Sequence, residues 1–449
     1  MHLLELTEKN LNRNIVRLCV PVAIENILHL GVFLSDTVMV GRLGTNAIAA
    51  AGLAGTLFFI ISMIFSSFSF GASSIVARYI GAREIHHAQL IASQAILMSI
   101  LLGILVTPPL FFFAEEIQLL MRATPVVAEQ GKGYLQAISV SLLFRLTILT
   151  SSGILRGAGD TRTPMKITFI INGINILLNW LLIFGIGPFP KLGVLGVGCA
   201  TAIAYTVGAG LFFSNLFAGK GILHVRIQDV MRIHGALIMR IARISLPATI
   251  DATLTQLSFL FFTLIVAMLG TVSLAAHQIA IRIESMSFML GIALAVSSAT
   301  LVGQSLGAKN ADLALISMKR TSYFALSLMG TFAIIFLVLP EQMAGMFKPE
   351  PEVLLLAALC IMISAIEQPA LAIYMVYSGG LRGAGDTLSP MIITIAGTLC
   401  LHAPMAYIFG ITLDWGLAGV WLGGAIDWIF RAAAIYILYR RGRWKRIEV

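Results

Sequence analysis

Charged residues are scarce in this chain. Asp, Glu, Lys and Arg make up 11% of its 449 residues, whereas 58% are hydrophobic and the mean hydropathy is +0.93. A soluble protein of this length needs far more charge to cover its surface, so the composition excludes that class. Apolar runs long enough to cross a bilayer, such as residues 88–113 and 323–339, alternate with short polar turns. We predict an all-α polytopic membrane protein with about twelve spans.

Cysteines and catalytic motifs are also few. The four cysteines fall inside apolar segments, where we interpret them as small buried residues with no disulfide framework. The sequence has no His/Cys cluster with metal-ligand spacing, no nucleophile elbow and no phosphate-binding loop. We therefore expect no enzymatic activity, no metal centre and no cofactor. Residues 1–17 are polar and charged, so we expect no cleavable signal peptide.

The formal charge of +9 is distributed unevenly along the chain. Lys and Arg gather before the first span, in alternate loops and in the tail at residues 440–446. This positive-inside pattern predicts an even number of spans in the plasma (inner) membrane, with both termini cytoplasmic. Nucleic-acid binding by the tail is the alternative, but a basic anchor that contacts membrane lipid is favoured. We expect no nucleic-acid partner.

An internal repeat runs through the chain at a nearly constant spacing. Arg156 in ILRGAGDT and Arg382 in GLRGAGDT are separated by the same spacing as Pro21 and Pro247. Only near the sixth span does this spacing become slightly shorter. Each half would hold six spans, so both halves enter the membrane in the same orientation. Such parallel repeats build transporters with the substrate path between two lobes.

The repeat predicts two pseudo-symmetric six-helix bundles. We place the N-lobe at residues 1–217, a basic cytoplasmic linker at 218–241 and the C-lobe, with its basic cytoplasmic tail, at 242–449. In each RGAGDT turn, Gly-x-Gly ends one helix, and Asp160 or Asp386 can cap the next. The alternative for the arginine and aspartate of this turn is a gating latch. The spans are expected near 14–41, 45–77, 88–113, 126–153, 164–187 and 192–217, then near 242–268, 272–303, 315–339, 352–379, 389–411 and 416–439.

One acid in the first span has polar residues at matching depth in other spans. Asp36 lies near the outer end of its span, and Asn179 of the fifth span and Thr201 of the sixth fall in the same half of the membrane. Asn172 and Asn175 share a helical face with Asn179. Carboxylate, amide and hydroxyl oxygens suit a hard cation. The alternative is that the asparagines only hydrogen-bond between helices.

Three motifs show a family resemblance: SDTVMVGRLG (35–44), LRGAGDT (155–161 and 381–387) and LGTVSLAAHQIA (269–280). The chain resembles the multidrug and toxic compound extrusion (MATE) family over nearly its whole length. The resemblance implies twelve helices in two bundles, a central cavity, no cofactor, and drug export driven by H+ or Na+. It also points to Asp36, Asn175, Asn179 and Thr201 as the cation site of the N-lobe.

Other intramembrane polar residues are candidates for a substrate cavity. Glu25 and His29 share a helical face with Asp36, although partner-facing structural roles are equally compatible with the pattern. In the second half, Asp251 and Glu367 lie one turn before Thr255 and Leu371, the positions where many Na+-coupled relatives carry acids. They are either displaced cavity acids or partners of Arg145 and Arg282, and Gln256 completes this candidate set.

The second half does not repeat the acid of the first span. At the spacing of the repeat, Phe262 stands where an equivalent of Asp36 would be, so the coupling site is expected in one lobe only. We interpret Glu284, Asp427 and Arg431 as structural. Because the acid pattern of the Na+-coupled branch is missing, the sequence favours the DNA-damage-inducible branch, which is commonly H+-coupled.

These observations favour one function. We predict a secondary active multidrug efflux antiporter that exports lipophilic, mostly cationic compounds in exchange for H+, with Na+ at Asp36, Asn175 and Asn179 as the alternative. In this mechanism Asp36 takes up a proton from outside, and its helix repacks or bends near Pro21. The main rival, a lipid or glycan-lipid flippase of related fold, would need several cationic side chains in its cavity.

Overall fold

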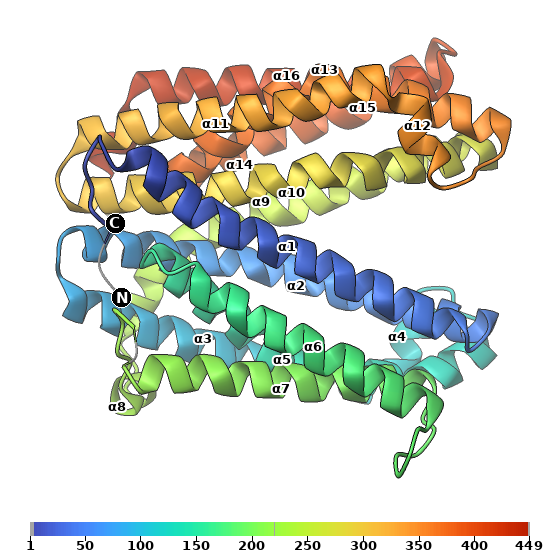
Figure 1. Ribbon diagram of the computed structural model, residues 1–449, viewed down its shortest axis with the longest axis horizontal. Helices are drawn as coiled ribbons and strands as arrows, with labels where there is room; N and C mark the ends of the chain where they lie inside the picture. The colour runs from blue at the N-terminus through green and yellow to red at the C-terminus, as the bar shows by residue number, and fades with distance from the viewer. Residues whose placement is uncertain (1–3, 220, 448–449) are drawn as a thin grey trace. The chain divides into compact units, whose positions relative to one another are not determined.

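The structure of the protein is a computed structural model that describes residues 4–219 and 221–447 (Figure 1). Within these ranges the chain forms helices joined by turns and no strand. The outermost residues of the predicted lobes, 1–3 and 448–449, and residue 220 of the predicted linker lie outside the described residues. The first half contains α1 (Leu11–Gly41), α2 (Thr45–Gly81), α3 (Ile85–Phe112), α4 (Ala114–Leu120), α5 (Pro125–Gly157), α6 (Arg162–Phe184), α7 (Val194–Phe217) and the short α8 (Ile227–Met231).

The second half repeats this order. Its helices are α9 (Gly235–Met268), α10 (Thr271–Gly307), α11 (Ala311–Val338), α12 (Pro340–Gly345), α13 (Pro351–Gly383), α14 (Leu388–Gly397), α15 (Ala403–Tyr407) and α16 (Gly416–Arg441). The turns η1 (Thr398–His402) and η2 (Ile408–Thr412) are π-helical, so α14, η1, α15 and η2 form one irregular span. A final 3-10 turn, η3, covers Arg443–Arg446.

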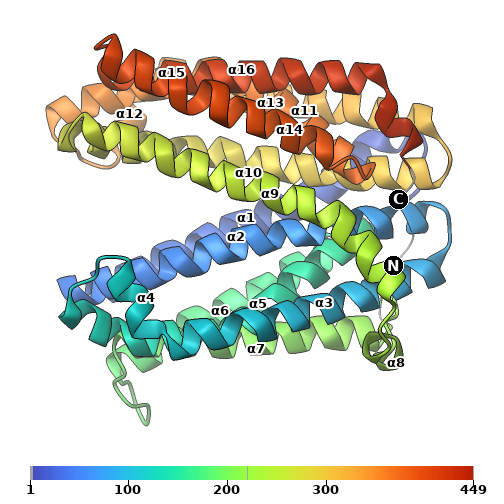
Figure 2. The same cartoon turned by 180° about the vertical axis from the view of Figure 1, so that it is seen from behind.

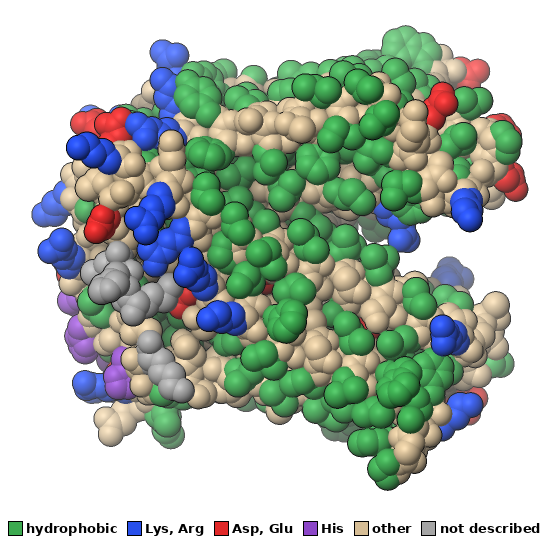
Figure 3. All heavy atoms as spheres, in the orientation of Figure 1, with side chains coloured by type: hydrophobic (Ala, Val, Ile, Leu, Met, Phe, Trp, Pro, Cys, Tyr) green, Lys and Arg blue, Asp and Glu red, His purple; other side chains and the backbone are tan. Residues whose placement is uncertain are grey.

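Most of the long helices in the described part of the chain have the length and the apolar composition of membrane spans. Twelve of its helices are long and apolar enough to cross a bilayer, which confirms the predicted all-α class and the number of spans. On the face shown in Figure 3, hydrophobic side chains cover the middle of the helices, and Lys and Arg gather near helix ends. Many large apolar side chains are exposed on the surface of the protein. In a membrane these side chains face lipid and not water, so their exposure is expected.

The chain folds into two compact units. Unit 1 contains Ile24–Ile80 and Glu84–Arg243, and unit 2 contains Leu4–Ala23, Gly81–Arg83 and the residues from Ile244 onward. Helix α1 therefore starts in unit 2 and continues in unit 1, whereas α9 starts in unit 1 and continues in unit 2. Helix α9 begins at Gly235, inside the stretch predicted as linker.

Two residues at equivalent positions of the repeat form hydrogen bonds to the segments that precede α9 and α1. In unit 1, Gln94 of α3 donates to two backbone oxygens at the end of α8, at 2.8 Å each, and accepts from the backbone N–H of His234 at 3.0 Å. In unit 2, Arg320 of α11 donates to the backbone and carboxylate oxygens of Glu8, at 2.9 and 2.5 Å. Arg320 is the repeat equivalent of Gln94, and His234 is the repeat equivalent of Glu8.

Glycines bring the central helices of each unit into backbone contact. A Cβ added to Gly157 of α5 would lie 2.4 Å from the carbonyl oxygen of Ser73 in α2, and one added to Gly383 of α13 would lie 2.1 Å from that of Ala299 in α10. The two contacts are equivalent, because both members of each pair are related by the spacing of the repeat. Small residues let helix backbones approach closely in a membrane, where dispersion replaces the hydrophobic effect between helices. Figure 2 shows α10 and α13 running together within unit 2.

The RGAGDT turns end these same helices. Asp160 accepts from the backbone N–H and hydroxyl of Thr163, at 3.0 and 2.6 Å, and Asp386 accepts from the same groups of Ser389, at 3.0 and 2.7 Å. Each aspartate therefore satisfies an otherwise unpaired N–H in the first turn of the next helix, as predicted for a cap. Gly159 and Gly385 adopt φ of +88° and +91°, which suits glycine.

The arginine of each turn pairs with a buried acid in the first helix of its half. Arg156 lies 2.7 Å from Oε2 of Glu25, and Arg382 forms an ion pair with Asp251. The two pairs are equivalent, since the spacing of the repeat relates both the arginines and the acids. The carboxylate side chains are 4% and 2% exposed, so each charge depends on its arginine.

Replacing Gly383 by Ala should separate α13 from α10, because the new methyl group would meet backbone that cannot turn aside. We expect a loss of about 1–3 kcal/mol in the free energy of unfolding. The matched control is Gly330→Ala in α11, where a Cβ meets nothing within 4 Å. Thermal unfolding of the two purified variants in detergent checks this; an equal midpoint for both would contradict it.

Replacing Arg382 by Gln should leave Asp251 as an unpaired buried charge. We expect a loss of roughly 3 kcal/mol, because the partner of a broken buried pair keeps its desolvation cost. The double variant Asp251→Asn/Arg382→Gln removes both charges and should recover more than half of the lost stability. Thermal unfolding of wild type, single and double variants tests the pair, and a double variant no more stable than the single one would refute it.

Candidate functional site

The acid of α1 meets two amides and a hydroxyl in unit 1. Nδ2 of Asn179 donates to Oδ1 of Asp36 at 2.6 Å and to Oδ1 of Asn175 at 3.1 Å, both asparagines lying on α6. Nδ2 of Asn175 donates in turn to Oγ1 of Thr201 on α7 at 3.2 Å. The structure thus joins the four residues that the sequence grouped, from three helices, in one chain of hydrogen bonds.

Local packing holds the three helices together around this cluster. Val40 of α1, Ile183 of α6 and Val197 of α7 form one buried apolar group next to the polar residues. A Cβ on Gly196 would lie 2.8 Å from the carbonyl oxygen of Leu182, so glycine at this position lets α7 approach the backbone of α6. Close approach of α6 and α7 brings the hydroxyl on α7 within reach of an α6 asparagine.

The cluster can hold a proton or a hard cation at a carboxyl group. Asp36 is half-buried and forms no ion pair within the described ranges. The carbonyl oxygen of Asn179 is buried and has no hydrogen-bond partner in the described part of the chain. A sodium ion would need that oxygen turned toward Asp36, whereas the amide now presents its N–H. The arrangement suits a carboxyl group that exchanges a proton.

Three other predicted residues of unit 1 lie outside this hydrogen-bond chain. Asn172 donates to the backbone oxygen of Leu28 at 2.8 Å, so it joins α6 to α1 instead of contacting Asp36. Glu25 is paired with the arginine of the first RGAGDT turn and accepts from Thr168 at 3.4 Å. His29 is partly buried on α1.

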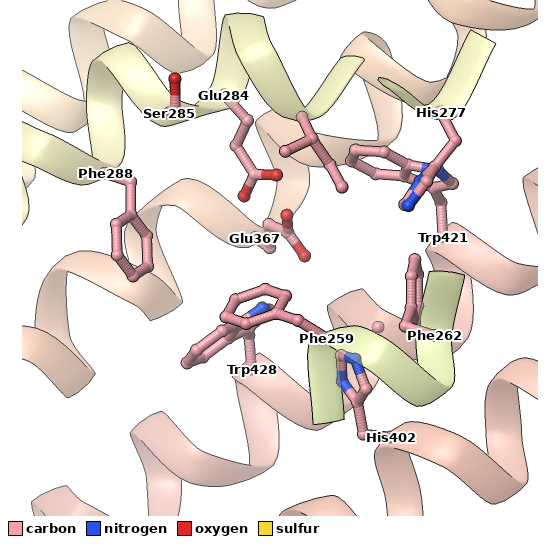
Figure 4. A pocket seen from close by; sticks show the side chains of 12 residues that line it. Phe259, Phe262, His277, Glu284, Ser285, Phe288, Glu367, His402, Trp421 and Trp428 are labelled. Carbon is pink, nitrogen blue, oxygen red and sulfur yellow. The ribbon is translucent and has the colours of Figure 1, made fainter. Parts of the chain in front are cut away.

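Unit 2 contains a pocket of about 140 Å³ (Figure 4). Two acids, two histidines, several aromatic rings and no Lys or Arg line it within the described residues. Its walls come from α9, α10, α13, α16 and η1: Phe259, Phe262, His277, Ile281, Glu284, Ser285, Phe288, Glu367, His402, Trp421, Gly424 and Trp428. An apolar cavity with a few convergent polar groups is typical of a small-molecule site.

The two acids of this pocket face each other. Glu284 of α10 and Glu367 of α13 point their carboxyl groups toward each other within the pocket (Figure 4). Two charged carboxylates that face each other would repel strongly in an apolar site, and a proton on one of them removes this repulsion. The pair therefore holds a proton, or it holds a cation in the proton's place.

The pocket occupies in unit 2 the place that the Asp36 cluster has in unit 1. Phe262 is the repeat equivalent of Asp36, and Gly424 is that of Thr201 at the slightly shorter spacing of the sixth spans. Phe262 lies over His402, with ring centroids 4.8 Å apart, and a Cβ on Gly424 would meet its ring at 3.3 Å. An aromatic side chain thus replaces the acid of unit 1, and a glycine replaces its hydroxyl. The two acids of the unit 2 pocket, Glu284 and Glu367, come from other helices, α10 and α13.

A buried ion pair contacts His402, one of the residues that line this pocket. Nε of Arg431 donates to both carboxylate oxygens of Asp427 at 2.9 Å, and its guanidinium also reaches the hydroxyl of Thr398 at 3.1 Å. Nδ1 of His402 lies 2.9 Å from the same carboxylate. The π-helical turn η1 carries both Thr398 and His402, which places them toward α16. The structural role expected for Asp427 and Arg431 agrees with this network.

The sequence-based interpretation of the second half needs two corrections. Asp251 pairs with Arg382, so the predicted partners Arg145 and Arg282 are wrong for it, and Asp251 is not among the residues that line the unit 2 pocket. Glu284 was expected to be structural, but it lines the pocket opposite the second acid, Glu367. Gln256 is partly buried on α9 and is not among the pocket residues.

The sequence analysis also missed the histidines and tryptophans of the pocket. His277 lies in the LGTVSLAAHQIA motif, and Trp421 lies in the last span. A titratable side chain in an apolar span was the available signal for His277. Across the described residues, His, Cys, Asp and Glu form no group of three that could hold a metal ion.

Comparison with known proteins agrees with this architecture. The MatE family model matches residues 21–181 and again 247–408, so it covers both halves of the repeat in the same register. The chain is 28% identical over 445 residues to a protein of Thermotoga maritima named "Probable multidrug resistance protein NorM", covering 98% of this chain and 94% of that one.

Solved structures show the same fold. "Crystal structure of MATE in the bent conformation" matches with a TM-score of 0.90 and 23% identity, over 96% of this chain and 95% of that one. "Outward-facing conformation of a multidrug resistance MATE family transporter of the MOP superfamily" matches with a TM-score of 0.88 and 22% identity, over 98% and 97%. The chain therefore belongs to the MATE family: it is an integral multi-pass membrane transporter and not an enzyme.

Proposed function

We propose that the protein is a secondary active multidrug efflux antiporter that exports lipophilic, mostly cationic compounds in exchange for H+. The observation that carries this proposal is that Asp36 in unit 1 and the Glu284–Glu367 pair in unit 2 form no ion pair with Lys or Arg among the described residues. An ionisable group inside a membrane is costly, and such a group without a partner marks an ion or substrate path. The names of relatives as multidrug resistance proteins support the substrate class.

The chemistry of the unit 2 pocket favours cations over anions. Its two acids attract a positive charge, and Phe259, Phe288 and Trp428 present aromatic rings that stabilise one. A cation that enters between the carboxyl groups displaces the proton they share, because the site then no longer needs it to limit repulsion. Loading with substrate and release of a proton would thus be two sides of one exchange.

Asp36 serves as the proton-coupling acid in this proposal. Asn179 donates to the carboxylate of Asp36, and Asn175 and Thr201 continue this hydrogen-bond chain. The Asn179 amide can also accept a hydrogen bond from the protonated carboxyl group, because an amide both donates and accepts. Protonation removes the charge and lets α1 repack beyond Pro21. Na+ is the alternative coupling ion, and assignment to the DNA-damage-inducible branch remains a prediction.

The arrangement in the membrane follows from the charge pattern. We place both termini on the cytoplasmic side of the plasma (inner) membrane, with the first and second halves as the N-lobe and C-lobe around the transport path. The rival function, export of a lipid or glycan-lipid, calls for cationic side chains where the phosphate or acidic sugar sits. None of the described residues that line the unit 2 pocket is Lys or Arg, which disfavours the flippase function.

Gradient-driven ethidium movement tests the proposal. Inverted membrane vesicles that contain the protein should accumulate ethidium when their interior is acidic, because protons then leave as the cation enters. A Na+ gradient imposed at equal pH on both sides distinguishes the alternative coupling ion. Absence of ethidium movement under either gradient, compared with vesicles lacking the protein, would remove the proposed function.

Replacing Asp36 by Asn should abolish this transport while the protein still inserts into the membrane, because the amide cannot take up a proton. We expect a fall in the ethidium rate of about 100-fold or more, in line with the loss of an essential proton-transfer group. Asp312→Asn, on an exposed side chain of α11, is the matched control and should transport normally. Normal drug resistance in cells carrying Asp36→Asn would contradict the role of Asp36.

A further inference from the structure

His277 of α10 is a buried side chain without a hydrogen-bond partner for either ring nitrogen in the described part of the chain. It is 0% exposed, and it points into the unit 2 pocket beside Trp421 (Figure 4). Its ring centroid lies 5.5 Å from that of Phe262 and 5.7 Å from that of Trp421. Buried polar atoms are nearly always paired, so two unpaired nitrogens on one buried ring need an explanation.

The other polar groups of the pocket restrict which hydrogen-bonding groups a bound molecule can offer to His277. A neutral imidazole has one nitrogen that accepts and one that donates, and the two carboxyl groups supply further acceptor oxygens. Lys and Arg are missing from the described lining, so no ammonium or guanidinium group among the lining residues donates to these acceptor atoms. The pocket therefore offers several acceptors to its occupant, and the occupant must supply N–H or O–H donors.

Size and shape restrict the occupant further. A cavity of about 140 Å³ is close to the engineered cavity of about 150 Å³ that holds benzene, so it suits one ring or one small charged head group. Phe259, Phe288 and Trp428 line the pocket and can contact the faces of such a group. A quaternary ammonium of this size would satisfy the aromatic rings and the charge, but it would leave His277 unpaired.

We infer that the unit 2 pocket selects organic cations that carry N–H donors, such as protonated primary amines, over quaternary cations, and that His277 accepts one of those hydrogen bonds. This inference rests on the proposed function, because it assumes that exported cations enter this pocket. The carboxyl pair supplies the charge that every organic cation requires. His277 adds the discrimination between cations with N–H donors and quaternary cations. Only a cation with N–H groups can hydrogen-bond to the carboxyl pair and to the imidazole together.

Two probes of matched size separate these contributions. Benzylammonium and N-ethylpyridinium each carry one positive charge, one six-membered ring and the same number of non-hydrogen atoms, but only benzylammonium has N–H donors. Calorimetric titration of the full chain in lipid nanodiscs at neutral pH gives the affinity for each. We expect benzylammonium to bind about tenfold or more tightly, which is what one hydrogen bond to a charged group contributes.

Variants at His277 assign the preference to this side chain. His277→Phe keeps an aromatic ring in the same place but has no acceptor, so the preference for benzylammonium should fall about tenfold from its wild-type value. His277→Gln restores an acceptor and should restore most of the preference. His224→Phe, on an exposed histidine of the linker, is the matched control and should keep the wild-type ratio.

The outcomes are distinct. Equal affinities in the wild type would overturn the inference, and a full preference retained in His277→Phe would overturn the role of His277. If neither probe binds while ethidium still moves with the gradient, the pocket is not a substrate site and the inference fails, but the proposed function stands. If ethidium does not move, the proposed function fails whatever the probes do. A structural role for His277 would change the affinities for both probes equally and leave their ratio unchanged.

Discussion

A carboxyl group inside a membrane is stable only when it is paired with a cation, protonated, or in contact with water, and this constraint sorts the acids of the protein by role. Glu25, Asp251 and Asp427 each have an arginine within ion-pair distance. Asp36, Glu284 and Glu367 have none in the described structure, and each instead faces amides or another acid. The first group joins helices through ion pairs, and we propose that the second group exchanges ions.

The repeat produces two scaffolds with different contents. The glycine contacts, the capped RGAGDT turns and the acid–arginine pairs recur in both units at the same spacing. The sites next to them do not recur, because Asp36 and Thr201 are replaced by Phe262 and Gly424. A duplicated framework thus supports a small polar cluster in unit 1 and an aromatic, acid-lined pocket in unit 2. The division is consistent with separate places for the coupling ion and the substrate.

Much of this arrangement could be predicted from the sequence, and the reasons are local. Apolar length identifies the spans, and the repeat sets their pairing between halves. Asp36, Asn179 and Thr201 could be grouped because depth within a span follows from counting residues. The Glu284–Glu367 pair could not, since the two acids lie on different helices and their meeting depends on how α10 and α13 are rotated. The arginine partner of Asp251 also depends on how the helices are rotated, so the sequence did not identify it. The repeat would have predicted Arg382 once the equivalent pair of Glu25 and Arg156 was known.

The two helices that begin in one unit and continue in the other affect how the protein can be assembled. Gln94 and Arg320 hold the segments that precede α9 and α1, and each segment belongs to the unit that does not contain the rest of its helix. A fragment cut at the linker would therefore lack a helix start that its own residues are arranged to receive. The two halves repeat one plan, yet each half holds the start of a helix whose remainder belongs to the other unit, so we expect neither half to fold alone as it does in the whole chain.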